Sequence, residues 1–216
     1  MHAVIINGSP RAEKYSNTEK IIDAFAKGME EAGASFERYA ISDRNCWDNA
    51  RVAYINNKEI LIALPLYVEN IPGLLLEFLE TLPKKDENTR LSFILQSGFA
   101  EASQLRCGEE FLEKLQKYLG VSYGGTLVKG DNFGIRFSGK AEMEKMTGPY
   151  QEMGKVFVKE NGFFSEEASS FSGPEYFSLP IRIFLQFLFK TVGKKRFVKV
   201  AKEWGCKVPI DYRPWA

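Results

Sequence analysis

Short apolar runs alternate along this chain with longer amphipathic segments. Residues 2–6 (HAVII) form an aliphatic run that ends at a turn, and residues 59–64 (EILIAL) are almost continuously apolar. Runs of this kind are typical of strands in a parallel sheet that is covered on both faces. Further strands are predicted over residues 35–41, 91–95 and 121–128.

The segments between these runs have helical spacing. Ser16 is a suitable N-cap, and Glu19 three residues later completes the pattern of a capping box. The apolar residues that follow recur three to four positions apart, as on one face of a helix. They are Ile21, Ile22, Phe25 and Met29.

Three more helices are predicted, over residues 73–82, 102–119 and 141–161. Gly148-Pro149 is expected to interrupt or begin the last one, because proline lacks the N–H of a helix interior. Alternating strands and helices predict an α/β fold with right-handed crossovers and an open parallel sheet. Ligands of such sheets bind beyond the carboxyl ends of the strands.

The loop after the first strand, residues 7–18 (NGSPRAEKYSNT), is rich in hydroxyl groups. A plain surface turn also favours Gly, Ser, Asn and Pro, so this interpretation stays open. The free N–H groups and the positive dipole end of a helix point into the loop that precedes it. Hydroxyl groups and the guanidinium of Arg11 would add donors suited to phosphate oxygens. The loop is therefore predicted to bind a phosphate.

Other catalytic motifs are missing. The P-loop pattern fails because Glu13 holds the place of its second glycine, and no G-x-G-x-x-G follows the first strand. The sequence has one histidine, His2, which we interpret as a solvated terminal residue. A Ser-His-Asp triad and a zinc site are therefore not expected, and the chemistry is expected to come from a cofactor.

Composition is that of a water-soluble globular protein. The 216 residues are 44% hydrophobic and carry a formal charge of +1, which favours neither nucleic-acid binding nor an acidic docking surface. No N-terminal apolar stretch is long enough for a signal peptide. The odd number and wide separation of Cys46, Cys107 and Cys206 indicate reduced thiols that serve mainly in packing. A cytoplasmic location is expected.

Three motifs at the carboxyl ends of strands carry a family resemblance. They are GSPR…SNT after the first strand, P-L-Y-x-x-x-x-P-G after the third and Ser-Gly-Phe after the fourth. Together they resemble the flavodoxin-like NAD(P)H-dependent FMN reductase family over about residues 1–160. The resemblance implies a three-layer α/β fold with a five-stranded parallel sheet in the order 2-1-3-4-5. It also implies FMN at the carboxyl edge, NADPH or NADH as co-substrate, and frequent homodimers.

The resemblance also assigns cofactor-binding residues in the three loops. Ser9, Arg11, Ser16, Asn17 and Thr18 match the ribityl-phosphate loop; Pro65, Leu66, Tyr67, Val68 and Asn70 match the loop along the isoalloxazine ring; Ser97, Gly98 and Phe99 match the loop near the other ring edge. The alternative interpretation of Tyr67 and of Phe99 is an aromatic residue that fills a gap between loops. An iron–sulfur cluster is excluded because Cys46 stands alone in its region, and no metal is expected.

The function that these features favour is an FMN-dependent oxidoreductase. It would take a hydride from NAD(P)H and reduce a small acceptor such as a quinone, a nitroaromatic compound or free flavin. A flavodoxin-type electron carrier without a nicotinamide site is one alternative, which the near-neutral charge disfavours. A non-enzymatic binding protein that keeps the fold is another.

A C-terminal extension, residues 165–216, follows the predicted flavodoxin-like domain of residues 1–164. A helix is predicted over residues 178–193, with Ser178 as N-cap, Pro180 in the first turn and Gly193 as terminator. Its strongly polar residues form one narrow stripe, Arg182, Gln186 and Lys190.

This apolar helix needs a partner surface. It is too short to span a membrane. Peripheral membrane contact over residues 178–196 is conceivable because basic residues follow at 194–196. A wide polar face is typical of such helices, however, so we expect a homodimer interface instead.

Overall fold

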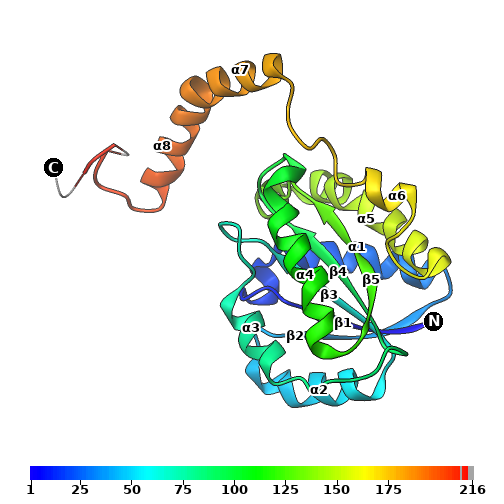
Figure 1. Ribbon diagram of the computed structural model, residues 1–216. Coiled ribbons are helices and arrows are strands. Elements are labelled where there is room, and N and C mark those ends of the chain that lie inside the picture. Colours follow the sequence, from blue (N-terminus) through cyan, green and yellow to red (C-terminus); the bar gives the residue numbers. More distant parts are fainter. Residues whose placement is uncertain (210, 214–216) are drawn as a thin grey trace. The chain divides into compact units, whose positions relative to one another are not determined.

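The computed structural model describes residues 1–209 and 211–213 (Figure 1). The chain divides into two units, Met1–Glu175 and a second unit that begins at Tyr176. The first unit thus includes residues 165–175, which the sequence-based division assigns to the extension.

The first unit is built on a parallel sheet of five strands. Its strands are β1 (His2–Asn7), β2 (Ser35–Ala40), β3 (Glu59–Pro65), β4 (Arg90–Gln96) and β5 (Ser122–Lys129). They pair in the order β2-β1-β3-β4-β5, all in parallel (Figure 1). The flavodoxin-like sheet order that the sequence implies is confirmed.

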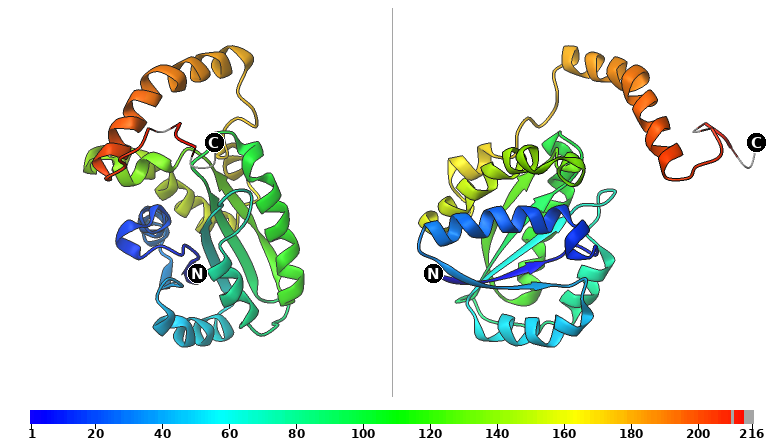
Figure 2. Two further views of the ribbon diagram at one scale, coloured as in Figure 1. Left: turned by 90° about the vertical axis from the view of Figure 1, so that its left-hand side faces the viewer. Right: turned by 180° about the vertical axis from the view of Figure 1, so that it is seen from behind.

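Helices cover both faces of this sheet. On one face lie α1 (Asn17–Glu31) and α5 (Lys140–Glu160), which Figure 2 shows in front of the strands in its right-hand view. On the other face lie α2 (Trp47–Asn56), α3 (Gly73–Glu80) and α4 (Arg106–Leu119). A short helix, α6 (Glu166–Ser170), follows α5.

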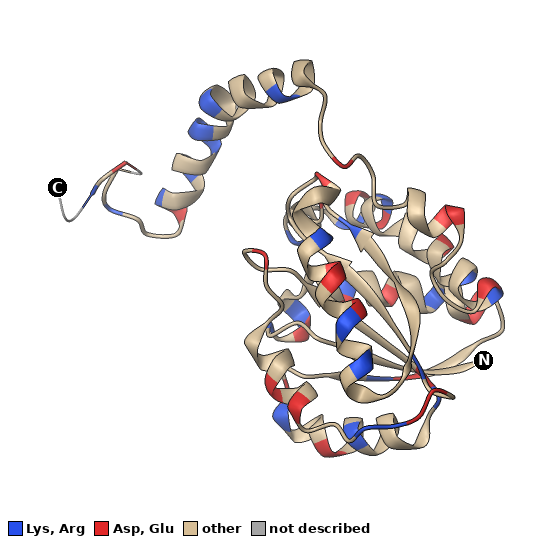
Figure 3. Ribbon diagram, in the orientation of Figure 1, with Lys and Arg blue, Asp and Glu red and all other residues tan. Residues whose placement is uncertain are grey.

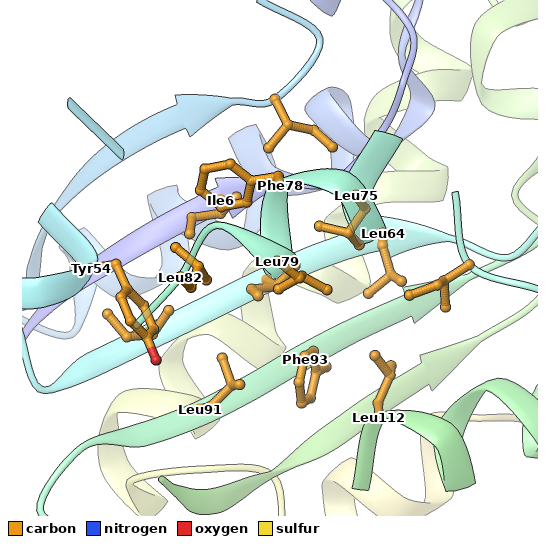
Figure 4. Packing of buried hydrophobic residues seen from close by; sticks show 14 of the residues in the cluster. Ile6, Tyr54, Leu64, Leu75, Phe78, Leu79, Leu82, Leu91, Phe93 and Leu112 are labelled. Carbon is orange, nitrogen blue, oxygen red and sulfur yellow. The ribbon is translucent and has the colours of Figure 1, made fainter. Parts of the chain in front are cut away.

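Alternation along the strands supplies two separate cores. In β3, Ile60, Ile62 and Leu64 point into the cluster under α2, α3 and α4, whereas Leu61 and Ala63 face α1 and α5. Figure 4 shows the first cluster, where Phe78 and Leu75 of α3 lie over strand residues including Leu64. Continuous apolar strands are therefore buried on both sides, as the sequence predicts.

Two local expectations for the first unit are wrong, and one helix is not anticipated. Ser16 accepts from the backbone N–H of Glu19, but the Glu19 carboxylate does not return to Ser16 and instead accepts from Asn7 Nδ2 at 2.6 Å. Half of the capping box is therefore absent. Pro149 lies inside α5 without interrupting it. Helix α2, Trp47–Asn56, is not anticipated from the sequence.

The second unit contains one continuous helical path. Helix α7 (Leu179–Leu188) passes through a π-helical turn (Phe189–Gly193) into α8 (Lys194–Glu203). The expected termination at Gly193 is wrong, because Gly193 has φ −60° and ψ −47° and continues the helix. Among the described residues, no helix is both long and apolar enough to cross a bilayer.

Candidate functional site

Four loops follow neighbouring strands at the carboxyl edge of the sheet. We call them the β1 loop (8–16), the β3 loop (66–72), the β4 loop (97–101) and the β5 loop (130–137). Because the strands are parallel and adjacent in the order β1, β3, β4, β5, these loops meet at one edge. His2, at the start of β1, lies at the opposite edge.

Buried hydroxyl groups line the β1 loop and the first turn of α1. Ser9 Oγ accepts from Arg11 N at 3.3 Å, and Ser16 Oγ accepts from Glu19 N at 3.2 Å. Thr18 Oγ1 accepts from Gln96 Nε2 at 3.2 Å. Each hydroxyl oxygen is thus held in place as an acceptor, while its own O–H remains available as a donor. These donors lie beside the free N–H groups of a helix N-terminus, which attract anions.

Asn17 connects this turn to the β5 loop. Its Nδ2 donates to the carbonyl of Asn132 at 2.8 Å, while its Oδ1 is buried and has no hydrogen-bond partner. Asn132 is itself buried and accepts from Tyr150 Oη through Oδ1 at 3.1 Å. Burial raises the pKa of Tyr150 far above its usual value, so this phenol stays protonated and serves as a donor. An unpartnered buried oxygen such as Asn17 Oδ1 is rare and suits a donor on a ligand.

A basic depression lies beside the β1 loop. Its volume is about 490 Å³, and its lining side chains are Arg11, Ala12, Lys14, Tyr15, Lys20 and Arg136. Within the described part of the chain, none of the four cationic residues forms a salt bridge. Four unpaired positive charges with no lining carboxylate favour an anionic occupant.

The β3 loop contains a tight turn with two residues, Val68 and Glu69, at its tip. Tyr67 and Asn70 exchange two backbone hydrogen bonds, of 2.9 and 3.1 Å. Val68 and Glu69 between them both have positive φ, 49° and 64°. A β-branched residue is rarely found in this conformation, which is strained for L-residues. Val68 is also 93% exposed, so the strain presents an apolar side chain to solvent.

The β4 loop is fastened to the β5 loop through backbone groups. Ser97 Oγ accepts from Phe99 N at 3.2 Å, and the carbonyl of Phe99 accepts from Asp131 N at 2.9 Å. A Cβ on Gly130 would lie 2.0 Å from the Phe99 carbonyl oxygen, so only glycine permits this close approach. Phe99 itself is 64% exposed although its backbone is held firmly.

The tips of the four loops expose apolar and aromatic side chains. Tyr15, Tyr67, Phe99 and Phe133 come from the β1, β3, β4 and β5 loops in turn, and all are exposed. Exposed aromatic side chains on neighbouring loops are suited to contact an apolar or planar group.

The sequence-predicted site residues fall into three groups. They are the buried, the half-buried and the exposed residues, and of the exposed ones Arg11 lies in the basic depression. The buried members are Ser9, Ser16, Thr18, Pro65, Leu66 and Ser97; Asn17 is half-buried; the exposed members are Arg11, Tyr67, Val68, Asn70, Gly98 and Phe99.

Leu66 makes no contact suited to a ligand through its side chain, because that side chain belongs to the core under α4. Its backbone N–H donates to the Gln96 carbonyl at 2.8 Å and so joins the β3 and β4 loops.

Sequence reasoning missed the β5 loop altogether. Asn132, Phe133 and Arg136 lie at the same edge as the predicted residues. The turn formers at 130–132 (GDN), directly after a strand, were the available signal. No group of His, Cys, Asp or Glu within the described residues is arranged to hold a metal ion.

Comparison with known proteins gives structural matches only. No protein-family model and no curated protein matches the sequence. An NAD(P)H:quinone oxidoreductase from Methanothermobacter marburgensis matches with a TM-score of 0.56 and 14% identity, over 73% of this chain and 96% of that chain. An FMN-dependent NADH-azoreductase from Bacillus anthracis, solved with FMN, matches with a TM-score of 0.53 and 14% identity, over 73% and 100%.

An NADH:FMN oxidoreductase in its apo form matches with a TM-score of 0.52 and 14% identity, over 77% of this chain and 92% of that chain. At these identities the matches show a common fold. They agree with the flavodoxin-like fold that the sheet order establishes.

Proposed function

We propose that this flavodoxin-like chain is an FMN-dependent oxidoreductase that takes a hydride from NADPH or NADH. The observation that carries the proposal is the division of the carboxyl edge into two parts. Buried hydroxyl donors and a helix N-terminus suit a phosphate, and exposed aromatic side chains on the adjoining loops suit a planar ring. A ligand with a phosphate at one end and a flat ring system at the other fits both parts.

The phosphate end would be held by the β1 loop. Ser9, Ser16 and Thr18 offer O–H donors, and the first-turn N–H groups of α1 add the helix dipole. Arg11 lies in the adjoining basic depression, where its guanidinium would add charge-assisted hydrogen bonds. The lining of this depression fits the phosphate of FMN, because it carries basic side chains and no carboxylate that would repel the anion.

The ring end would be held by the β3 and β4 loops. Tyr67 and Phe99 offer aromatic surface, and the fastened backbone of the β4 loop keeps its N–H and C=O groups in fixed positions. These side chains would also exclude water from one face of the ring. FMN, when bound, would supply the redox chemistry, because its ring can accept a hydride from NADPH or NADH and pass electrons to the acceptor.

The acceptor belongs to the same proposal. The similar structures include a quinone oxidoreductase and an azoreductase, which supports a small aromatic or quinoid acceptor. A cytoplasmic location agrees with the free cysteines. A homodimer is compatible with this function but is not required by it.

The first test is a visible absorption spectrum of the purified protein with and without added FMN. We expect a bound-flavin spectrum with a shift from that of free FMN. Anaerobic addition of NADPH or NADH should then bleach it. A shifted spectrum without bleaching would instead identify an electron carrier, and no shift at any FMN concentration would refute a flavin site.

A further inference from the structure

The helical segment 179–203 has no core of its own. None of the described residues of the second unit is buried. The large apolar side chains of this segment stay exposed, Phe184 at 62% and Phe187 at 68%. A helix that is apolar over most of its surface is stable only when another phase or surface covers it.

Continuation of the helix through Gly193 adds a face that residues 178–193 alone lack. Along α8 and its C-cap residue, four apolar residues recur at i, i+3, i+4 and i+7, the spacing of a single helical face. They are Phe197, Val200, Ala201 and Trp204. Lys195, Lys199 and Lys202 occupy the opposite side at i, i+4 and i+7. The wide polar face expected of an interfacial helix is therefore present in α8.

Positive charge is concentrated in this segment. Residues 179–203 contain seven Lys or Arg and one acidic residue, Glu203, which gives a net charge of +6. The other 22 basic and 27 acidic residues of the chain give −5. Figure 3 shows the basic positions as blue bands along α8. Within the segment, the structure gives one ion pair, Lys199–Glu203 at 3.9 Å, so most of the basic side chains are unpaired.

We infer that residues 179–203 form an amphipathic helix that docks this protein on an anionic lipid surface. The apolar side chains would enter the boundary between head groups and acyl chains, while the lysines of α8 meet anionic head groups. Apolar and basic faces on one helix, together with a net charge opposite to that of the lipid, select this occupant. The inference is independent of the proposed flavin chemistry.

A second copy of the helix is a poorer occupant. Pairing two such segments would bring two charges of +6 together, and like charges at an interface oppose association. The homodimer interface favoured by the sequence treats residues 178–193 as a complete helix with a narrow polar stripe. The continuous path into α8 removes that premise.

The test is co-sedimentation of the full chain with vesicles. One preparation contains phosphatidylcholine alone, and the other contains phosphatidylcholine mixed with phosphatidylglycerol. We expect strong binding to the anionic vesicles, weak binding to the neutral ones, and weaker binding as the salt concentration rises.

The variant that tests the charge is Lys195→Glu/Lys199→Glu/Lys202→Glu, which should lower affinity for the anionic vesicles by about 100-fold or more. The matched control is Lys27→Glu/Lys84→Glu/Lys145→Glu, which changes three exposed lysines of the first unit that form no salt bridge within the described residues. The control carries the same charge change and should retain most of the binding. Circular dichroism and thermal melting would verify that both variants fold.

A third variant, Phe187→Ser/Phe197→Ser, keeps the charge and removes apolar area. It should also release the protein from the vesicles. Light scattering without lipid completes the experiment. A stable dimer that does not bind anionic vesicles would overturn the inference in favour of the homodimer. Equal loss of vesicle binding in the two lysine triple variants would also overturn the inference, because binding would then depend on the overall charge of the protein and not on this segment.

Discussion

Two regions of this protein expose aromatic side chains, and they are supported in opposite ways. At the carboxyl edge of the sheet, Phe99 is exposed, but its backbone N–H and C=O are bonded to Ser97 and Asp131. In the segment 179–203, Phe184 is exposed on α7, and no described residue of its own unit is buried. The loop tips are presented by the buried core of their unit, whereas the helical segment has no buried core within its own unit.

This difference teaches what each region is suited to bind. A small planar ligand loses little by entering a site whose walls are already fixed, because few side chains must be ordered. An unsupported amphipathic helix suits an extended surface that can cover its whole length. Exposed aromatic residues alone do not distinguish a small-ligand site from an extended docking surface. The distinction comes from the hydrogen bonds and the core that hold the backbone beneath them.

The largest expected effect compares one buried and one exposed phenylalanine. Phe25 is fully buried on α1, with its ring 5.6 Å from Phe157 and 5.9 Å from Phe163. Phe25→Ala should reduce the free energy of unfolding of the first unit by about 3–5 kcal/mol. Phe184→Ala should change it by less than about 0.5 kcal/mol. Urea denaturation followed by circular dichroism measures both.

Comparable losses of unfolding free energy in the two variants would mean that the helical segment contributes to the stability of the first unit. The contrast between a unit with a buried core and a helix without one would then be wrong.

The strands were predictable because burial on both faces leaves a strong mark in the sequence. Residues 60–64 of the run EILIAL are all buried, and the structure places the run in β3 at the centre of the sheet. Helix α2 left no such mark. Its buried residues are Trp47, Ala50, Ala53 and Tyr54, and two alanines give a weak apolar signal.

Local signals failed where tertiary contacts decided the outcome. Glu19 fits a capping box by spacing, but Arg38 from β2 pairs with its carboxylate and holds it elsewhere. Gly193 fits a helix terminator by its type, but its backbone has the φ and ψ of a right-handed helix, and the path continues into α8.

Of the candidate site, the sequence predicted the positions of three loops, since turn formers follow strands one, three and four. The network from Asn17 through Asn132 to Tyr150 joins residues more than a hundred positions apart, and no local pattern marks it. Which residues bind FMN stays a prediction.

The second prediction compares two unpaired arginines, one in each region. If Arg11 meets the phosphate of FMN, Arg11→Ala should weaken FMN binding by about 1.5–3 kcal/mol, the range for charged hydrogen bonds. Binding of riboflavin, which lacks the phosphate, should hardly change. Arg182→Ala, in the helical segment, should leave FMN affinity unaltered. Fluorescence titration gives all the dissociation constants.

Equal losses of FMN and riboflavin affinity in Arg11→Ala would show that Arg11 supports the fold of the β1 loop instead of binding the phosphate.

The third prediction tests an exposed tyrosine of the β3 loop against an exposed tyrosine elsewhere. Tyr67→Ala should weaken FMN by about 1–3 kcal/mol, on a scale taken from stacking on nucleic-acid bases, and should brighten flavin fluorescence. Tyr118→Ala on α4, also exposed, should change neither quantity. Unchanged affinity and fluorescence in Tyr67→Ala would place Tyr67 away from the flavin.

The smallest expected effect concerns the backbone of the same turn. Val68 adopts φ 49°, a region that costs an L-residue about 1–2 kcal/mol and that asparagine tolerates better. Val68→Asn should therefore raise the free energy of unfolding by about 1 kcal/mol, measured by urea denaturation. Glu69, at φ 64°, offers the matched control Glu69→Asn, in which a smaller gain is expected because glutamate is not β-branched.

The same substitution also distinguishes stability from binding. Since the Val68 side chain is 93% exposed, its replacement removes no buried contact in the free protein. Any loss of FMN affinity would therefore reflect a lost contact between Val68 and FMN or a changed shape of the turn. A rise in stability with weaker FMN binding would mean that strain in the β3 loop is retained for the ligand. A fall in stability would contradict the assignment of strain to Val68, because relief of a strained φ has only one sign.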